Sequence, residues 1–267
     1  MVKERPMLLS TNMVAATIMG LKTKTRRTKG LELVNQNPNE WKLIDCGMFE
    51  FPPTGKELKG KEVFGSTFRW KPYGSQNFIK CPYGQPGDVL WVRETWCPAD
   101  IFDQRFYSFK ASPETLTIAC DGQTYSIPPI WRPSIHMPKI AARIWLQITD
   151  IRVERLQDIT DADALAEGIH RESPAAMGFS FLEGLDDTTL SEHVKAQLNE
   201  EAYYFYPCKD LRDDSYISKP ATSFTSLWAS INGWESWNAN PWVWVISFKV
   251  LSKTGKPAEI GKEVSHV

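Results

Sequence analysis

The residue types best suited to chemistry in this chain lie in a short basic run, GLKTKTRR, over residues 20–27. The run holds four cations and two hydroxyls within six consecutive residues, Lys22, Thr23, Lys24, Thr25, Arg26 and Arg27. Cations gathered in this way bind anionic partners, of which phosphate is the commonest. Alternation of Lys and Thr also places both hydroxyls on one side of an extended segment. The run therefore predicts a ligand-binding or catalytic segment.

A short amphipathic helix is predicted immediately before the basic run. Apolar residues recur at helical spacing from Leu9 to Ile18, Ser10 or Thr11 can cap the start, and Gly20 can end the helix. Basic side chains beyond a helix C-terminus gain about 0.3–1 kcal/mol each from the helix dipole. A solvated helix end therefore remains the alternative to a ligand-binding segment.

Glu167 is a second candidate for a functional residue, because it is an acidic side chain at the C-terminal end of a predicted helix. Thr160 and Asp163 form a capping-box-like helix start and Gly168 a helix end, so Glu167 falls in the last turn. A carboxylate there faces the negative end of the helix dipole, at a cost of about 0.3–1 kcal/mol. This environment suits Glu167 to carry a proton; the alternative is a solvated glutamate or one paired with a nearby arginine.

The composition is that of an ordinary globular protein. The chain has 267 residues, 42% of them hydrophobic and 24% charged, and a net charge of −1, so any affinity for nucleic acid must come from a local patch. The five cysteines form no CxxC pair and have no nearby histidine, so no metal and no other cofactor is expected. The N-terminus lacks an apolar signal core and no long apolar run occurs, so we expect a cytoplasmic protein without a membrane partner.

The elements that must position these residues are mostly strands. Eleven Trp and eighteen Pro favour many short strands and loops over a helical bundle. Strands are predicted at 41–44, 64–70, 89–96, 141–153 and 242–250, short strands within 98–134, and helices at 160–168, 190–198 and 222–231. Strands with small helices between them predict a compact α+β barrel decorated by helices.

The chain resembles the ASCH family of the PUA-like β-barrel superfamily. The matching blocks come in the family's order: GLKTKTRR at 20–27, PGDVLWV at 86–92, AEG at 166–168 and WVISF at 244–248. Further blocks, among them CPYG at 81–84 and WRPSIHMP at 131–138, are similar to the longer ASCH proteins of bacteriophages and prophages. The resemblance implies one PUA-like domain over residues 1–252, with insertions at about 28–80, 98–134 and 171–222, and a polar tail at 253–267.

The resemblance also implies a cleft that receives RNA, DNA or a nucleoside. Small bacterial members are amidohydrolases that remove the acetyl group from the exocyclic amine of acetylated cytidine. By their motif, Lys22 is the proton acceptor and Thr25 the nucleophile, and the alignment of the second helix makes Glu167 the proton donor. A lysine has an ordinary pKa of about 10.4, so Lys22 must be depressed by roughly 3 units to act near pH 7. Neighbouring cations and burial both act in that direction.

Three functions follow as hypotheses. In the first, Lys24, Arg26 and Arg27, with Lys22, hold phosphate or sugar while a pocket recognises a nucleobase that can carry a modification. In the second, Lys22, Thr25 and Glu167 form an amidohydrolase. In the third, the insertions of a phage-encoded protein bind a host factor. Five tryptophans include candidates for stacking on a base, namely Trp91, Trp96, Trp131, Trp242 and Trp244.

Overall fold

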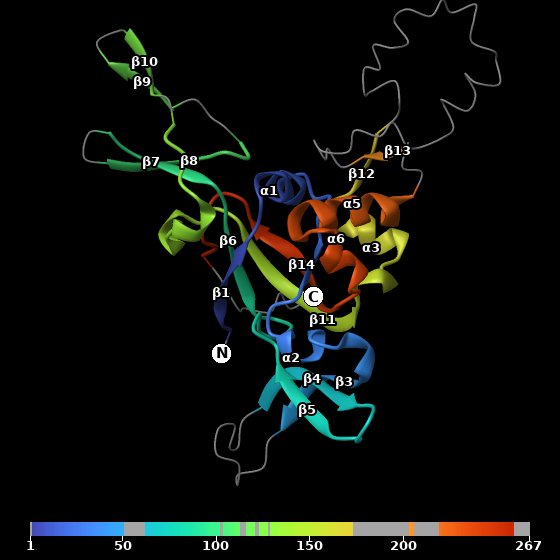
Figure 1. Ribbon diagram of the computed structural model, residues 1–267. Coiled ribbons are helices and arrows are strands. Elements are labelled where there is room, and N and C mark those ends of the chain that lie inside the picture. Colours follow the sequence, from blue (N-terminus) through green and yellow to red (C-terminus); the bar gives the residue numbers. More distant parts are fainter. Residues whose placement is uncertain are drawn as a thin grey trace, which may run out of the picture.

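The computed structural model describes residues 2–50, 62–101, 104–112, 116–120, 123–127, 129–172, 203–205 and 219–258. Its centre is a five-stranded sheet in the order β1-β6-β11-β14-β2 (Figure 1). The strands are β1 (Glu4–Leu8), β6 (Val89–Arg93), β11 (Trp145–Arg155), β14 (Trp242–Ser252) and β2 (Lys24–Arg27). β1 runs parallel to β6, and the other neighbours are antiparallel.

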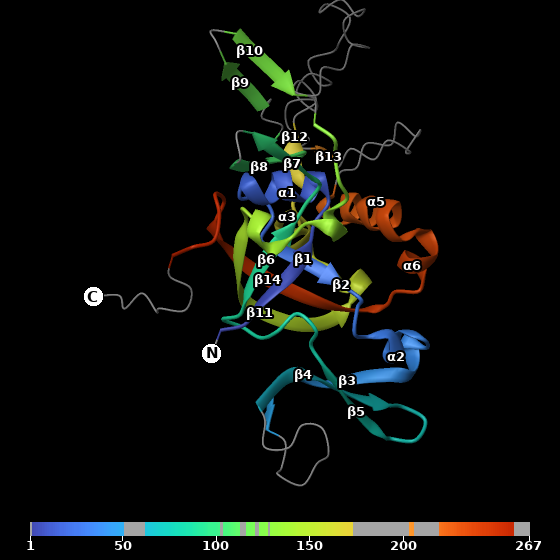
Figure 2. The same ribbon diagram turned by 90° about the vertical axis from the view of Figure 1, so that its left-hand side faces the viewer.

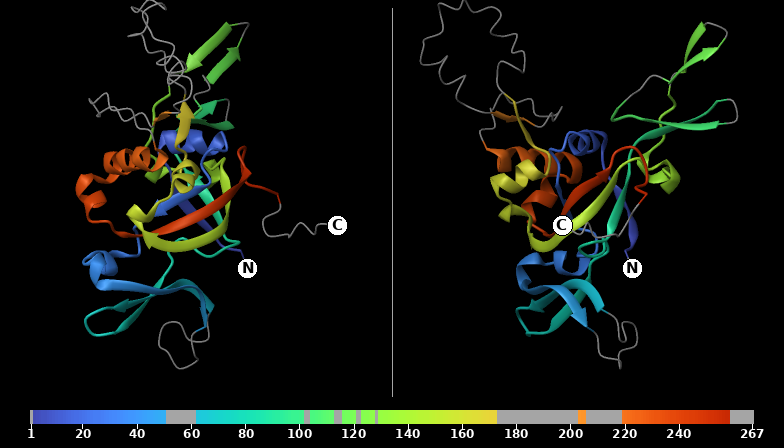
Figure 3. Two further views of the ribbon diagram at one scale, coloured as in Figure 1. Left: turned by 90° about the vertical axis from the view of Figure 1, so that its right-hand side faces the viewer. Right: turned by 180° about the vertical axis from the view of Figure 1, so that it is seen from behind.

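The two longest strands of this sheet, β11 and β14, lie next to each other and pair along most of their length. Val243 to Ile246 are all buried, in a core that also includes residues of α1, α5, β3 and β4. The register of β11 on β14 shifts between Ile148 and Asp150, where the ladder is irregular. β11 and β14 curve across the molecule together (Figure 3, left).

Five described α-helices accompany this sheet. They are α1 (Thr11–Ile18), α2 (Glu32–Asn35), α3 (Asp161–Ala166), α5 (Pro220–Asn232) and α6 (Trp234–Asn238). In α3 the Thr160 hydroxyl accepts a hydrogen bond from the Asp163 N–H at 3.1 Å, as predicted. α5 begins at Pro220, before the expected Thr222, because proline is well suited to the first helical position. α3, α5 and α6 lie together beside β14 in Figures 1 and 2.

The insertions form separate small sheets at two ends of the molecule. One holds β3 (Trp41–Glu50), β4 (Glu62–Trp70) and β5 (Gln76–Lys80), where only weak strand signals were expected. The other end carries the pairs β7 (Trp96–Ile101) with β8 (Gln104–Phe109) and β9 (Leu116–Cys120) with β10 (Gln123–Ile127) (Figure 2). β12 (His170–Glu172) pairs with β13 (Tyr203–Phe205). The helix predicted at 190–198 lies outside the described residues.

Four short 3-10 turns complete the described elements: η1 (Pro38–Glu40), η2 (Ser134–His136), η3 (Lys139–Ala141) and η4 (Leu156–Asp158). None of the helices in the described ranges has the length and hydropathy needed to span a bilayer.

The mixed α+β class is confirmed, but the described strands do not close into a barrel. The strand order ends at β1 and β2, which share no backbone ladder. A side chain joins these two edges instead, because Arg27 Nη2 donates a hydrogen bond to the Leu8 carbonyl at 2.6 Å. The central sheet is therefore open along the line where β1 faces β2.

Candidate functional site

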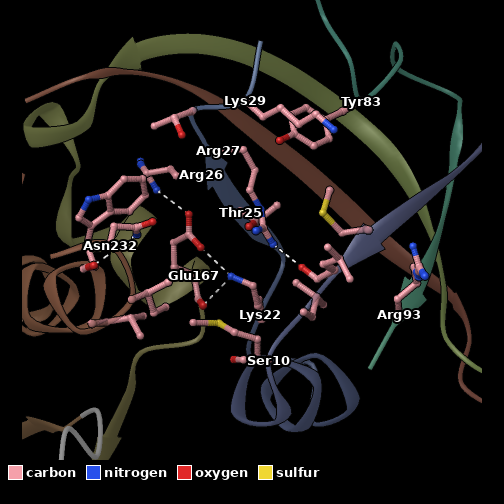
Figure 4. A pocket seen from close by; sticks show the side chains of 18 of the residues that line it. Ser10, Lys22, Thr25, Arg26, Arg27, Lys29, Tyr83, Arg93, Glu167 and Asn232 are labelled. Atoms are coloured by element: carbon pink, nitrogen blue, oxygen red, sulfur yellow. Dashed lines mark hydrogen bonds and ion pairs between the residues drawn. The ribbon is translucent and has the colours of Figure 1, made fainter. Parts of the chain in front are cut away.

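A pocket of about 500 Å³ lies at this open edge of the sheet. Its walls come from the end of β1 and the start of α1, from residues 25–29 in and after β2, and from α5 (Figure 4). Lys22 and Glu167 line it between α1 and α3. The pocket thus collects residues that are far apart in the sequence, including those of the basic run.

Lys22 and Glu167 form a buried ion pair that faces the pocket. Lys22 Nζ lies 2.6 Å from Glu167 Oε2 and 2.9 Å from the Glu167 carbonyl oxygen. The two residues are only 1% and 3% exposed, and their backbones form an isolated antiparallel bridge. The sequence predicted that these residues share one site, and the structure brings them together (Figure 4).

Gly168 allows the end of α3, which carries Glu167, to pack closely against α1 and Lys22. Its φ of +99° is unfavourable for other residues, and it ends α3 directly after Glu167. A Cβ at this position would lie 3.0 Å from the Ala16 Cβ of α1 and 3.3 Å from the Lys22 Cβ. A larger residue would therefore push α3 away from α1 and from Lys22.

Burial is the main influence on the Lys22 amine. It lowers the pKa of Lys22 below the usual 10.5, and the charges of Arg27 and Arg26 act in the same direction. The carboxylate of Glu167 opposes this effect without cancelling it. Lys22 therefore gives up its proton more readily than a solvated lysine.

Thr25 lines the same pocket and is 4% exposed. No hydrogen bond found among the described residues uses its hydroxyl, so the oxygen is available to a ligand. Thr23, by contrast, is exposed and does not line the pocket. The two hydroxyls do not act together as the alternation suggested, because β2 begins only at Lys24.

Lys24 and Arg26 are already neutralised by carboxylates. Lys24 Nζ lies 2.5 Å from Asp163 Oδ1, and Lys24 does not line the pocket. The fully buried guanidinium of Arg26 contacts three carboxylates, those of Glu154 at 2.6 Å, Asp163 at 2.9 Å and Glu167 at 3.2 Å. This arrangement gives no support to the phosphate-binding role predicted for these two cations.

The carboxylates of this cluster are held from several sides. Arg152 reaches Glu154 at 2.9 Å and Asp163 at 2.5 Å. Burial alone would raise the pKa of Asp163, but the hydrogen bond from Lys24 and the surrounding positive charges outweigh it and lower that pKa below 3.8. The cluster ties β2, β11 and α3 together and fixes Arg26 behind Glu167.

Arg27 is the predicted phosphate-binding residue for which the described ranges hold no carboxylate partner. It lines the pocket, and its only side-chain hydrogen bond within those ranges runs to the Leu8 carbonyl. Its Nε is buried and has no hydrogen-bond partner there.

Several pocket residues were missed by the sequence analysis. α5 supplies an apolar wall from Phe224, Leu227 and Trp228, whereas none of the five tryptophans proposed for stacking lines the pocket. Tyr83, Lys29 and Arg93 also line it. Burial raises the pKa of Tyr83 to about 12, so its hydroxyl stays a hydrogen-bond donor. The helical spacing of Phe224, Leu227 and Trp228 was visible, but it predicted only a core face.

A second buried ion pair lies outside the pocket. Arg143 donates through Nε and Nη2 to the two carboxylate oxygens of Glu94, each at 2.9 Å. Glu94 is 1% exposed, and the guanidinium of Arg143 lies 4.2 Å from the centre of the Phe109 ring. Neither member of this pair lines the pocket.

The described residues define a mixed α+β protein with an open central sheet and a small-molecule-sized pocket at its edge. Among them, no three His, Cys, Asp or Glu side chains are grouped so as to hold a metal ion. No protein-family model, no curated protein and no solved structure matches the chain. The ASCH resemblance therefore stays a prediction.

Proposed function

We propose that this pocket binds a nucleoside-type ligand and hydrolyses an acyl amide on the exocyclic amine of its base, as in the ASCH amidohydrolases that the chain resembles. The observation that carries the proposal is the 2.6 Å contact between Lys22 Nζ and Glu167 in the floor of the pocket that Thr25 also lines. On this proposal the open sheet corresponds to a PUA-like barrel.

The pocket dimensions support a ligand of this size. A volume of about 500 Å³ lies within the range of about 300–1,000 Å³ usual for small-molecule sites. Phe224 and Trp228 offer aromatic surface against which a base can pack, at about 1–3 kcal/mol per stacked base. Polar groups come from both sides of the pocket, Lys22 and Thr25 from the basic run and Asn232 from α5.

The environment of the ion pair supports a proton-transfer role. Burial lowers the pKa of Lys22 and so favours its neutral form. Neutral Lys22 is the base that the reaction needs, and the carboxyl group of Glu167, 2.6 Å from its Nζ, is placed to exchange a proton with it.

The reaction follows in two stages. Lys22 takes the Thr25 hydroxyl proton while Thr25 Oγ attacks the acyl carbon, and Glu167 gives its proton to the departing exocyclic amine as the C–N bond breaks. The result is an acyl ester on Thr25 and a free base amine. A water molecule then attacks the ester, Thr25 Oγ leaves and takes up the proton that the water gives, and the carboxylic acid is released. Transfer of one proton from Lys22 to Glu167 restores the starting pair.

A second candidate function is recognition of the modified base without turnover. The contact between Arg26 and Glu167 at 3.2 Å favours it, because Arg26 and Lys22 then hold one carboxylate oxygen each and Glu167 is fixed within the protein. Such a site would bind an acylated base and release it unchanged.

The test is incubation of the full chain with acetylated cytidine, followed by chromatography. We expect deacetylation that Thr25→Val abolishes, because the variant keeps the shape of the side chain and removes the hydroxyl. Thr23→Val is the matched control, since Thr23 is exposed outside the pocket. Binding without turnover would favour recognition, whereas no preference for the acetylated over the plain nucleoside would refute both functions.

A further inference from the structure

The charged residues of the pocket divide into two sets. In the floor, Lys22 and Arg26 both contact Glu167, which is the only acidic residue among the described lining residues. Closer to solvent lie Arg27, Lys29 and Arg93, here called the outer cations. The inner charges therefore balance within the protein, while the outer cations face a pocket that offers them no carboxylate.

The two outer arginines lie on either side of Leu8 in the open edge of the sheet. Arg27 reaches the Leu8 carbonyl from β2, and Arg93 is the register partner of Leu8 on β6. Arg93 donates through Nη2 to the Ile135 carbonyl. Neutral carbonyls thus hold both guanidinium groups in place without cancelling their charge.

Both arginines also carry unused donors. The Nε atoms of Arg27 and Arg93 are buried and have no hydrogen-bond partner among the described residues. A buried donor without a partner costs about 1–3 kcal/mol, and more when it is charged. Since both Nε atoms are closed to solvent here, a ligand would recover that cost by drawing the guanidinium groups toward its own acceptors.

Lys29 and Tyr83 add to the same side of the pocket, where Figure 4 shows them together. The charge of Lys29 is shared, because it contributes to the lowered pKa of Glu32, whose carboxylate mainly accepts a hydrogen bond from the Gly30 N–H. The Tyr83 hydroxyl remains a neutral donor. The two arginines are thus the principal source of uncompensated charge.

We infer that the ligand carries a phosphate ester, and that Arg27 and Arg93 bind it while the base occupies the pocket floor. A guanidinium matches the paired oxygens of a phosphate, and two of them suit a group that bears one or two negative charges. This inference rests on the proposed function and narrows its ligand from a nucleoside to a nucleotide. A free mononucleotide and a phosphodiester within a single strand both present this chemistry.

The experiment compares three ligands on the full chain by isothermal titration: acetylated cytidine, its 5′-monophosphate, and a short single-stranded oligonucleotide that contains the modified base. We expect the phosphate to tighten binding at least tenfold over the nucleoside. Arg93→Gln and Arg27→Gln should each remove about tenfold of affinity for the phosphorylated ligands and less than twofold for the nucleoside. Arg69→Gln, at an exposed arginine on β4, is the matched control.

Each outcome decides a different point. Equal affinity for nucleoside and nucleotide overturns the phosphate inference and leaves the proposed function standing. Failure of all three ligands to bind overturns both. Tight binding of the oligonucleotide alone assigns the phosphate to a strand, and tight binding of the monophosphate assigns it to a free nucleotide. If Arg27→Gln unfolds because Leu8 loses its partner, Arg93→Gln and the steepness of salt dependence carry the test.

Discussion

The Glu94–Arg143 pair and the Lys22–Glu167 pair each join a buried carboxylate to a cation within 3 Å. In the first pair one partly buried guanidinium bonds both carboxylate oxygens and packs on Phe109, and neither residue lines the pocket described above. In the second pair the cation is an amine, its pKa is lowered, and both residues line the pocket.

The difference matters for the proposed function. A guanidinium keeps its proton in a folded protein, so the Glu94–Arg143 pair cannot exchange a proton between its members. A lysine pair can pass its proton to the carboxylate when burial disfavours separate charges. The pocket then gives a ligand access to the neutral amine.

The largest expected effect that tests this comparison is on activity. Lys22→Met should lower deacetylation at least about 10³-fold, because it removes the base while filling a similar volume. The free energy of unfolding should change much less than in the arginine variant described next, since Arg26 still holds Glu167. Chromatographic rates and urea unfolding measure the two effects. Retained activity would remove Lys22 from the mechanism.

Arg143→Met is expected to lower the free energy of unfolding strongly and to leave activity unchanged, which is the reverse of Lys22→Met. It leaves Glu94 buried without its cation and should reduce the free energy of unfolding by about 3–5 kcal/mol. The folded fraction should deacetylate at the normal rate, because Arg143 does not line the pocket. Urea unfolding with rates corrected for the folded fraction measures this. A specific loss of activity at full stability would contradict the separation of the two pairs.

A smaller effect on stability is expected from the cluster behind Glu167. The pKa of Asp163 in the folded state lies below 3.8. The ionised Asp163 carboxylate therefore contributes in full to the free energy of unfolding above about pH 3.8, and this contribution is lost as the pH falls through the folded-state pKa. Asp163→Asn should therefore cost about 1.5–3 kcal/mol at pH 7 and flatten the decline below pH 4. Thermal unfolding at a series of pH values tests this. An unchanged acid limb would show that Asp163 is not part of the cluster in solution.

The smallest expected effect is a shift in a pH profile. Glu167 raises the pKa of Lys22 against the influence of burial, so Glu167→Gln should lower the pKa of Lys22 further. Residual activity that depends on neutral Lys22 should then rise at lower pH than in the unchanged protein. The pH dependence of kcat/KM reports it, with Thr23→Val as the control. A shift to higher pH would mean that Lys22 and Glu167 do not share one proton.

Local patterns predicted much of the framework. The helix start at Ser10, the capped helix start at Thr160 and the apolar strand at the C-terminal side were all visible in the sequence, because each depends on residues within a few positions. The Ser10 hydroxyl makes no capping hydrogen bond. The extent of the small sheet in residues 41–80 was underestimated, because its strands are stabilised by pairing across the sheet more than by periodicity.

The site was predicted in part. The resemblance placed Lys22, Thr25 and Glu167 together, and all three line the pocket. The neutralisation of Lys24 and Arg26 was missed, because their partners lie more than 120 residues away and reach them only through the register of β2 on β14. The contribution of α5 and Arg93 was missed for the same reason, since neither adjoins the basic run in sequence.

The glycine after Glu167 has a consequence for any survey of variants of this chain. Gly168 carries no charge and offers no side chain to a ligand, yet its missing methyl group sets the spacing of α3 from α1. On the proposed function, replacement by alanine would strain the backbone and crowd Ala16 and Lys22, and would so alter the contact between Lys22 and Glu167 without removing either group. A loss of activity in such a variant would therefore not make Gly168 a residue that contacts the ligand.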